Sequence, residues 1–189
     1  MRKNLLLSLF LFFLVGCQTI DSALTTSGKI TESTSAFDNK VAIAMSPALA
    51  NSGMKDVQAE FGLFWQTNFE NTIIFSVKIN EIESFSPTQP LLMRIDGVVY
   101  ELPPVNNFSS TDFDVEYLRG VGVLSSSSKT FEGSKEIVQA IIDGTEASYR
   151  ISLARGRYAD GEITYRYKNY KSYVPTAFKE FLQRVEQEI

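Results

Sequence analysis

Apolar and polar residues alternate through much of the chain, and a period of two is the signature of half-buried β-strands. From Val57 to Trp65 every second residue is apolar, and the same holds from Ile73 to Ile79. The segment NFEN between these two runs has the composition of a turn. The two runs are therefore predicted to pair as an antiparallel hairpin.

The clearest turn signal is the dipeptide Asp96-Gly97, which separates the apolar segments LLMRI and VVYEL. Aspartate followed by glycine supplies the positive φ angles that a two-residue hairpin turn requires. The second segment runs into Pro103-Pro104, and proline has no N–H to donate to a strand ladder. We therefore expect a tight hairpin that ends at these prolines.

Shorter runs complete the pattern of strands. They predict strands at 41–45, 113–118, 149–153 and 163–167. The last two are expected to join near residues 158–161, and the serine-rich segment 125–129 is expected to be a polar loop.

Two segments have helical spacing instead, with apolar residues three and four positions apart. The first helix is predicted at about 134–143, where Ser134 can cap the first turn and Gly144 suits the end. The second is predicted at about 175–188, with Pro175 in its first turn. Because hairpin connections imply antiparallel pairing, the expected fold is mainly β: an antiparallel sheet or sandwich of about seven or eight strands with two helices.

The N-terminus has a different texture, with the basic residues Arg2 and Lys3 followed by an almost unbroken apolar run from Leu5 to Val15. This run is too short for a transmembrane helix, which needs about 20 apolar residues. It has the length of the apolar core of a secretory signal peptide.

The tetrapeptide Leu14-Val15-Gly16-Cys17 at the end of this run resembles the lipobox of bacterial lipoprotein precursors. The resemblance implies that the Cys17 sulfur receives a diacylglycerol, that the chain is cut just before Cys17, and that the new amino group receives a fatty acid such as palmitate. Gln18 in place of an aspartate implies the outer membrane, with the protein facing the periplasm. An ordinary signal peptide with an incidental cysteine is the alternative.

These features divide the chain into three parts: a signal peptide at 1–16, the lipidated Cys17 with a flexible tether rich in serine and threonine at 17–39, and a single β-rich domain at 40–189. A tether of about 20 such residues would span about 25 Å as a random coil.

The absent residue types restrict the chemistry. The chain has no histidine, and Cys17 is its only cysteine. This excludes a Ser-His-Asp triad, a Cys-His dyad, a histidine-ligated metal and a cysteine redox pair. No glycine-rich phosphate loop or nucleotide fingerprint occurs, so no cofactor is expected. The formal net charge of −4, which becomes −6 without residues 1–16, argues against nucleic acid as a partner.

The segment 149–173 is basic in an otherwise acidic chain, with six basic and two acidic residues interleaved with six tyrosines. Guanidinium groups and tyrosine rings suit anionic or glycan ligands. The candidate ligand-binding face comprises Arg150, Arg155, Arg157, Tyr158, Arg166 and Lys168. We expect Arg150, Arg166 and Lys168 on the outward faces of two strands, with Tyr158 in the loop between them. The alternative is a solvated sheet face whose charges pair with acidic residues.

A second candidate is the acidic series Asp112, Asp114 and Glu116, whose side chains would share one face of a strand. Because the series lacks the glycine turn of a calcium loop, we interpret it as a solvated strand face, and no metal is expected.

The leading hypothesis is a membrane-anchored envelope lipoprotein that acts as a non-enzymatic binding module, with another envelope protein or an anionic cell-wall component as its partner. Two alternatives remain open. One is a hydrolase of envelope glycans that uses carboxylates such as Glu81, Glu83 and Glu101, which would have to lie about 5–9.5 Å apart. The other is a structural subunit of an envelope assembly, which predicts a sizeable exposed apolar patch.

Overall fold

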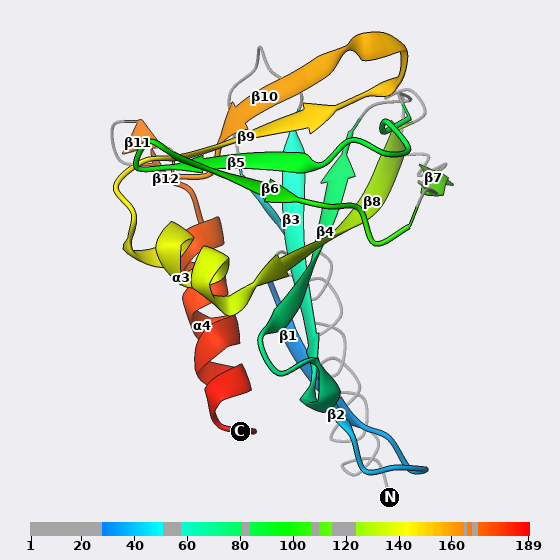
Figure 1. Cartoon of the computed structure of the whole chain (residues 1–189), viewed down its shortest axis with the longest axis vertical. Coiled ribbons are helices and arrows are strands. Elements are labelled where there is room, and N and C mark those ends of the chain that lie inside the picture. The colour runs from blue at the N-terminus through cyan, green and yellow to red at the C-terminus, as the bar shows by residue number, and fades with distance from the viewer. Residues whose placement is uncertain are drawn as a thin grey trace, which may run out of the picture.

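The computed structural model describes residues 28–50, 58–80, 84–106, 110–114, 124–164, 166–167 and 170–189. For 110–114, 124–125, 166–167 and 170–171 it describes the backbone alone. The predicted fold class is confirmed, because the described chain is mainly β, with antiparallel sheets and two α-helices (Figure 1).

A six-stranded antiparallel sheet forms one layer of the sandwich. Its strands, in spatial order, are β1 (Ile30–Thr34), β2 (Val41–Leu49), β3 (Ala59–Gln66), β4 (Thr72–Ile79), β8 (Leu124–Ser134) and β7 (Ser110–Asp114). The β3–β4 hairpin is the one that alternation predicts, and a 3₁₀ turn at Thr67–Phe69 connects its strands. Every second residue from Ala59 to Trp65 and from Ile73 to Ile79 is buried, as expected.

A four-stranded sheet forms the other layer, and a short two-stranded ribbon forms a third sheet. The strands of the four-stranded sheet, in spatial order, are β10 (Tyr158–Glu162), β9 (Ala147–Ser152), β5 (Leu91–Ile95) and β6 (Val98–Leu102). The ribbon pairs β11 (Arg166–Tyr167) with β12 (Tyr170–Lys171). The described part of the chain thus holds more strands than the pattern predicts.

The Asp96-Gly97 turn is confirmed, because Ile95 pairs with Val98 across it and φ is 45° at Asp96 and 88° at Gly97. The Asp96 carboxylate also accepts hydrogen bonds from the backbone N–H groups of Thr145 (3.0 Å) and Glu146 (2.9 Å). The turn therefore also holds the loop that leads into β9, and the sequence pattern did not predict this contact.

Two helices complete the layer that faces the six-stranded sheet. The four-stranded sheet crosses one end of this sheet, and α3 (Lys135–Asp143) and α4 (Val174–Glu186) cover the other end (Figure 1). Both helices lie within two residues of their predicted bounds. Each presents an apolar stripe to the core, and α4 packs on α3, β2 and β3. None of the helices in the described chain has the length and apolar character needed to cross a membrane.

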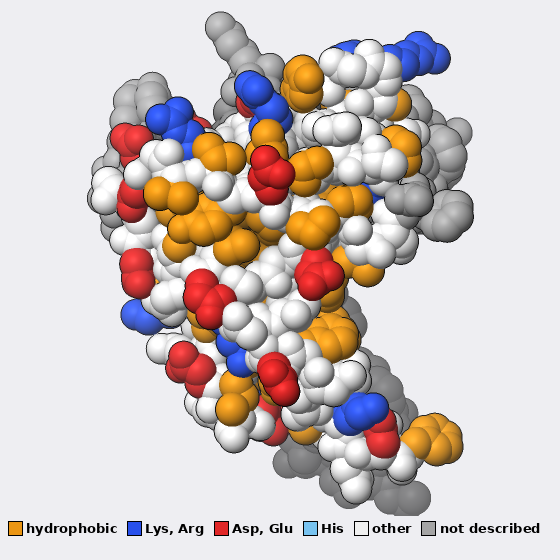
Figure 2. Space-filling view, viewed as in Figure 1, with side chains coloured by type: hydrophobic (Ala, Val, Ile, Leu, Met, Phe, Trp, Pro, Cys, Tyr) orange, Lys and Arg blue, Asp and Glu red, His pale blue; other side chains and the backbone are white. Residues whose placement is uncertain are grey.

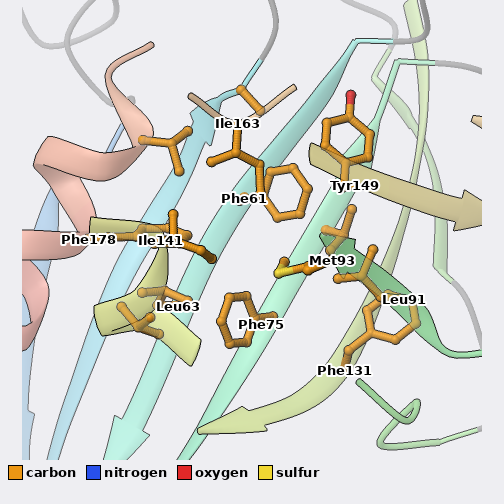
Figure 3. Close-up of a cluster of buried hydrophobic side chains, with 14 of the residues drawn as sticks. Phe61, Leu63, Phe75, Leu91, Met93, Phe131, Ile141, Tyr149, Ile163 and Phe178 are labelled. Atoms are coloured by element: carbon orange, nitrogen blue, oxygen red, sulfur yellow. The ribbon is translucent and has the colours of Figure 1, made fainter. Parts of the chain in front are cut away.

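One apolar core fills the space between these layers (Figure 3). Phe61 of β3 meets Tyr149 of β9 edge to face, with 5.1 Å between the ring centroids. Phe75 of β4 meets Phe178 of α4 in the same way at 6.0 Å. The six-stranded sheet thus packs on both the second sheet and a helix.

The chain passes directly from one sheet to the other after β6. The backbone N–H of Glu132 in β8 donates to the carbonyl of Pro103 (2.8 Å), and the N–H of Val105 donates to the carbonyl of Thr130 (3.1 Å). The prolines that were predicted to end the hairpin therefore mark the corner between the two sheets.

The prediction of a loop at 125–129 is wrong, because these residues belong to β8. The strand pairs on both sides, with β4 and with β7, so its backbone polar groups have partners despite the serine-rich composition. Ser127 and Lys129 face the core and are buried. The Lys129 ammonium donates to the carbonyls of Ser86 (2.6 Å) and Pro87 (2.7 Å).

The predicted connection at 158–161 is also wrong, because these residues form most of β10. The chain turns earlier, at the 3₁₀ segment Ala154–Gly156, where φ is 59° at Arg155 and 73° at Gly156. Glycine supplies a left-handed position there, and the arginine beside it gave no turn signal. Of the strand expected at 163–167, Ile163 comes directly after β10 and is buried, and residues 166–167 form β11.

The expected tether overlaps the folded part of the chain, because β1 pairs with β2 from Ile30 opposite Met45 to Thr34 opposite Val41. Four of the five β1 side chains are exposed, so the strand has no apolar alternation and is held through its backbone. The boundary expected at residue 40 therefore lies inside a hairpin. Residues 1–27, with Cys17, lie outside the described residues, as do 115–118 of the strand predicted at 113–118.

Candidate functional site

The outward face of the four-stranded sheet brings charged side chains into register. On β5, Leu91, Met93 and Ile95 point into the core, so Leu92 and Arg94 point outward. Cross-strand pairing then sets two rows across the sheet. The rows are Glu101–Leu92–Arg150–Asp160 and Val99–Arg94–Ser148–Glu162.

Two adjoining hollows lie along these rows. The first has a volume of about 310 Å³, and its lining includes Leu92, Arg94, Val99, Ser148, Arg150 and Asp160. The second has a volume of about 460 Å³, and its lining includes Arg94, Gly97, Glu146, Ser148, Glu162 and Thr164. Arg94 and Ser148 line both, so the hollows form one depression, which we call the outer groove.

Arg150 and Asp160 form a bidentate ion pair on one side of the outer groove. The guanidinium Nε and Nη2 donate to the two carboxylate oxygens at 2.8 and 2.7 Å. The hydrogen bond from Arg150 lowers the pKa of Asp160, and the same bond raises the pKa of Arg150. Asp160 is therefore held ionised, which makes it a poor proton donor for catalysis.

Tyr158 extends this side of the groove. The Arg150 guanidinium carbon lies 5.1 Å from the centroid of the Tyr158 ring, within the range of a cation–π contact. The tyrosine remains 62% exposed. An exposed aromatic ring beside a guanidinium–carboxylate pair can stack on a ligand while polar groups hold its edges.

Arg94 occupies the centre of the outer groove and differs from Arg150. Its side chain is exposed, and no carboxylate of the described residues forms an ion pair with it. A guanidinium without a carboxylate partner offers its donors to a carboxylate or phosphate of a ligand. Arg94 lies outside the basic segment 149–173 that indicates a ligand-binding face, although its polar place in the alternating segment LLMRI marks it as outward-facing.

The structure brings together only part of the predicted face. Arg150 and Tyr158 meet on the outward face, but Tyr158 lies in β10 and not in a loop. Arg155 lies in the turn between β9 and β10, and Arg157 directly follows that turn.

The expectation that Arg150 and Arg166 lie on two neighbouring strands is wrong. Arg150 lies on β9 of the four-stranded sheet, whereas Arg166 lies on β11 of the separate ribbon. The physical reason is that β10 takes the position beside β9 that the sequence pattern predicts for residues 163–167. Lys168 lies outside the described residues.

The outer groove carries both signs of charge. Glu146 and Glu162 line it together with Asp160, against Arg94 and Arg150. The groove is therefore not the basic surface that the sequence predicted. Guanidinium forks, carboxylates and hydroxyls in one shallow depression match the hydroxyl groups of a sugar as well as a single anionic substituent.

The acidic candidates do not assemble into a site within the described chain. Glu81, Glu83 and Glu116 lie outside the described residues, and Glu101 is exposed on β6. For Asp112 and Asp114 the backbone lies in β7. Among the residues that the structure describes, no group of three acidic, histidine or cysteine side chains could hold a metal ion.

Comparisons with known proteins leave the geometry as the basis for interpretation. No protein-family model matches the chain, and neither the curated proteins nor the solved structures give a significant match.

Proposed function

We propose that the protein is an envelope lipoprotein, anchored through Cys17, that binds a cell-wall glycan bearing anionic groups without catalysing a reaction on it. The observation that carries this proposal is the outer groove, in which Arg94 lies opposite Ser148 in one row and the Arg150–Asp160 pair lies in the neighbouring row. The lipobox resemblance at residues 14–17 supports the anchor and the location at the outer membrane.

Each side chain in the outer groove has a role in this proposal. Arg94 binds a carboxylate or phosphate of the ligand through paired N–H donors. Ser148 and the Arg150–Asp160 pair exchange hydrogen bonds with hydroxyl groups, and Tyr158 stacks on the apolar face of a sugar ring.

The groove favours binding over hydrolysis. A glycosidase needs one carboxyl group that stays protonated, and enzymes achieve this by burying it. Asp160 is ionised by Arg150, and Glu146 and Glu162 are exposed to solvent. The open depression therefore lacks the enclosed acid of a hydrolase among the described residues.

The binding claim is tested with purified sacculi and with soluble fragments that carry carboxylates. Arg94→Ala should weaken binding about tenfold to hundredfold, since a hydrogen bond to a charged group contributes about 1.5–3 kcal/mol. Arg94→Lys keeps the charge but loses the fork, so it should recover only part of the affinity. Lys179→Ala removes one exposed positive charge from α4 and is the matched control.

Equal binding by Arg94→Ala and the wild type would overturn the role of the groove, and release of shorter glycans would favour a hydrolase. The anchor is tested separately by Cys17→Ser, which should move the protein from the membrane fraction to the soluble fraction. Unchanged retention in the membrane would contradict lipidation.

A further inference from the structure

The turn between β1 and β2 presents a phenylalanine to solvent. Phe37 has a relative exposure of 102%, so its ring contacts nothing else in the described chain. Phenylalanine is among the residues most often buried in folded proteins. Figure 2 shows a hydrophobic side chain projecting from the end of this hairpin, beside one basic and one acidic side chain. Phe37 therefore adds no packing to the fold.

Hydrogen bonds and an ion pair hold the backbone of this turn. The Ser35 N–H donates to the carbonyl of Lys40 (2.8 Å), and the Asn39 N–H donates back to the carbonyl of Ser35 (3.0 Å). The Phe37 N–H donates to the Ser35 hydroxyl (3.3 Å). Lys40 and Asp38 form an ion pair at 2.7 Å. These bonds fix the backbone so that it holds the phenylalanine ring outward.

The hairpin has a fixed base as well as a fixed tip. Ile43 and Met45 of β2 are buried in the core. On β1, Glu32 accepts a hydrogen bond from Arg184 of α4 at 2.8 Å. We call residues 30–41 the finger, which extends from the body at the end opposite the four-stranded sheet (Figure 1).

The finger has the charge and polarity of an element that touches a lipid surface only at its tip. The ion pairs Lys40–Asp38 and Arg184–Glu32 balance the charges of the finger, so neither an anionic nor a cationic lipid surface repels it. The exposed β1 side chains behind the tip are polar. Insertion would therefore stop once the aromatic ring had entered the headgroup boundary, about 5–10 Å deep.

The chain length allows the tip and Cys17 to reach the same surface. Cys17 precedes Ile30 by 13 positions, which can span at most about 43–47 Å. Phe37 follows Ile30 by seven positions, or about 23 Å of extended strand. A lipid on Cys17 can therefore lie in the plane that the Phe37 ring touches.

We propose that the finger rests on the lipid surface that anchors Cys17, with the Phe37 ring inserted among the headgroups. This inference rests on the proposed lipid anchor. It gives the domain a second point of attachment and directs the four-stranded sheet, with its outer groove, away from the membrane.

The test uses the full acylated protein in vesicles of phosphatidylethanolamine and phosphatidylglycerol, after mass spectrometry has confirmed diacylglycerol on Cys17. Phe37→Trp adds an indole at the tip, and Tyr158→Trp adds one to the four-stranded sheet as the matched control. Trp65 is buried and gives both variants the same background. Brominated lipids should quench the new indole of Phe37→Trp several-fold more than that of Tyr158→Trp.

A second measurement follows transfer of the acylated protein between vesicles. Phe37→Ser should speed desorption about tenfold to hundredfold, the factor expected for losing one buried aromatic side chain. Tyr158→Ser should leave the rate unchanged.

The outcomes separate the inference from the anchor. Two results with acylated protein would overturn the finger's lipid contact and leave the anchor standing. One is equal quenching of the two tryptophan variants. The other is a photoreactive phenylalanine analogue at position 37 that crosslinks to a protein in cells. Absence of acylation overturns the anchor. Preferential quenching of Phe37→Trp, with crosslinking to phospholipid, supports the inference.

Discussion

At the scale of single residues, Asp160 decides the charge of the outer groove because it neutralises Arg150. The two side chains are about half exposed, so their ion pair contributes little to stability despite its bidentate geometry. The chemical importance of the pair is that it occupies a guanidinium that would otherwise be available to an anion.

Asp160→Asn should therefore separate stability from binding. We expect the free energy of unfolding to change by less than about 1 kcal/mol, because exposed ion pairs are weak. Binding of an anionic glycan should become tighter and more sensitive to salt, since the groove gains one positive charge. Calorimetric titration at two salt concentrations measures the effect, and unchanged salt dependence would show that Arg150 does not face the ligand.

Lys129 gives a second residue-scale prediction, based on pH. Desolvation lowers the pKa of this buried lysine, so in the pH range just below about 10.4 the unfolded chain binds more protons than the folded one. The free energy of unfolding should therefore rise with pH in that window. The wild type should gain stability relative to Lys129→Met in urea unfolding between pH 7 and pH 10. Parallel pH profiles of the two proteins would contradict this.

At the scale of elements, the β5–β6 turn links two parts of the fold. Asp96 supplies a left-handed residue to the turn, and its carboxylate holds the loop before β9. Asp96→Ala should cost about 1–3 kcal/mol, because it strains the turn and leaves two N–H groups without their acceptor. Asp96→Asn keeps a side-chain oxygen and tolerates the same φ, so its loss should be smaller. Equal losses in chemical denaturation would argue against the carboxylate's role.

The sequence predicts an element well where one of its faces is buried. It predicts an element poorly where backbone pairing with neighbouring strands determines the structure. The β3–β4 and β5–β6 hairpins and both helices follow from apolar spacing and turn residues. β1, most of β10 and the serine-rich part of β8 do not, because their backbones pair with neighbours whatever their side chains prefer. A period of two shows which side chains point outward but not which strands are neighbours, so Arg94 was missed and Arg166 was misplaced.

At the scale of the whole molecule, a single core joins both sheets and both helices. Phe75 is fully buried in this core, against Phe178 of α4 and beside the β8 backbone at Gly133. Phe75→Ala should lower the free energy of unfolding by about 3–5 kcal/mol. Far-ultraviolet and near-ultraviolet circular dichroism should still report one coincident transition, because no layer has a core of its own. Two separated transitions would show that the layers unfold independently.

The placement of the C-terminus has a practical consequence for measuring ligands. α4 ends at the same end of the molecule as the finger, and Ile189 is 78% exposed there (Figure 1). A capture tag fused after Ile189 would hold the protein on a biosensor chip by this end. The outer groove would then face the flowing solution, so the protein could be screened against glycan libraries without a bilayer.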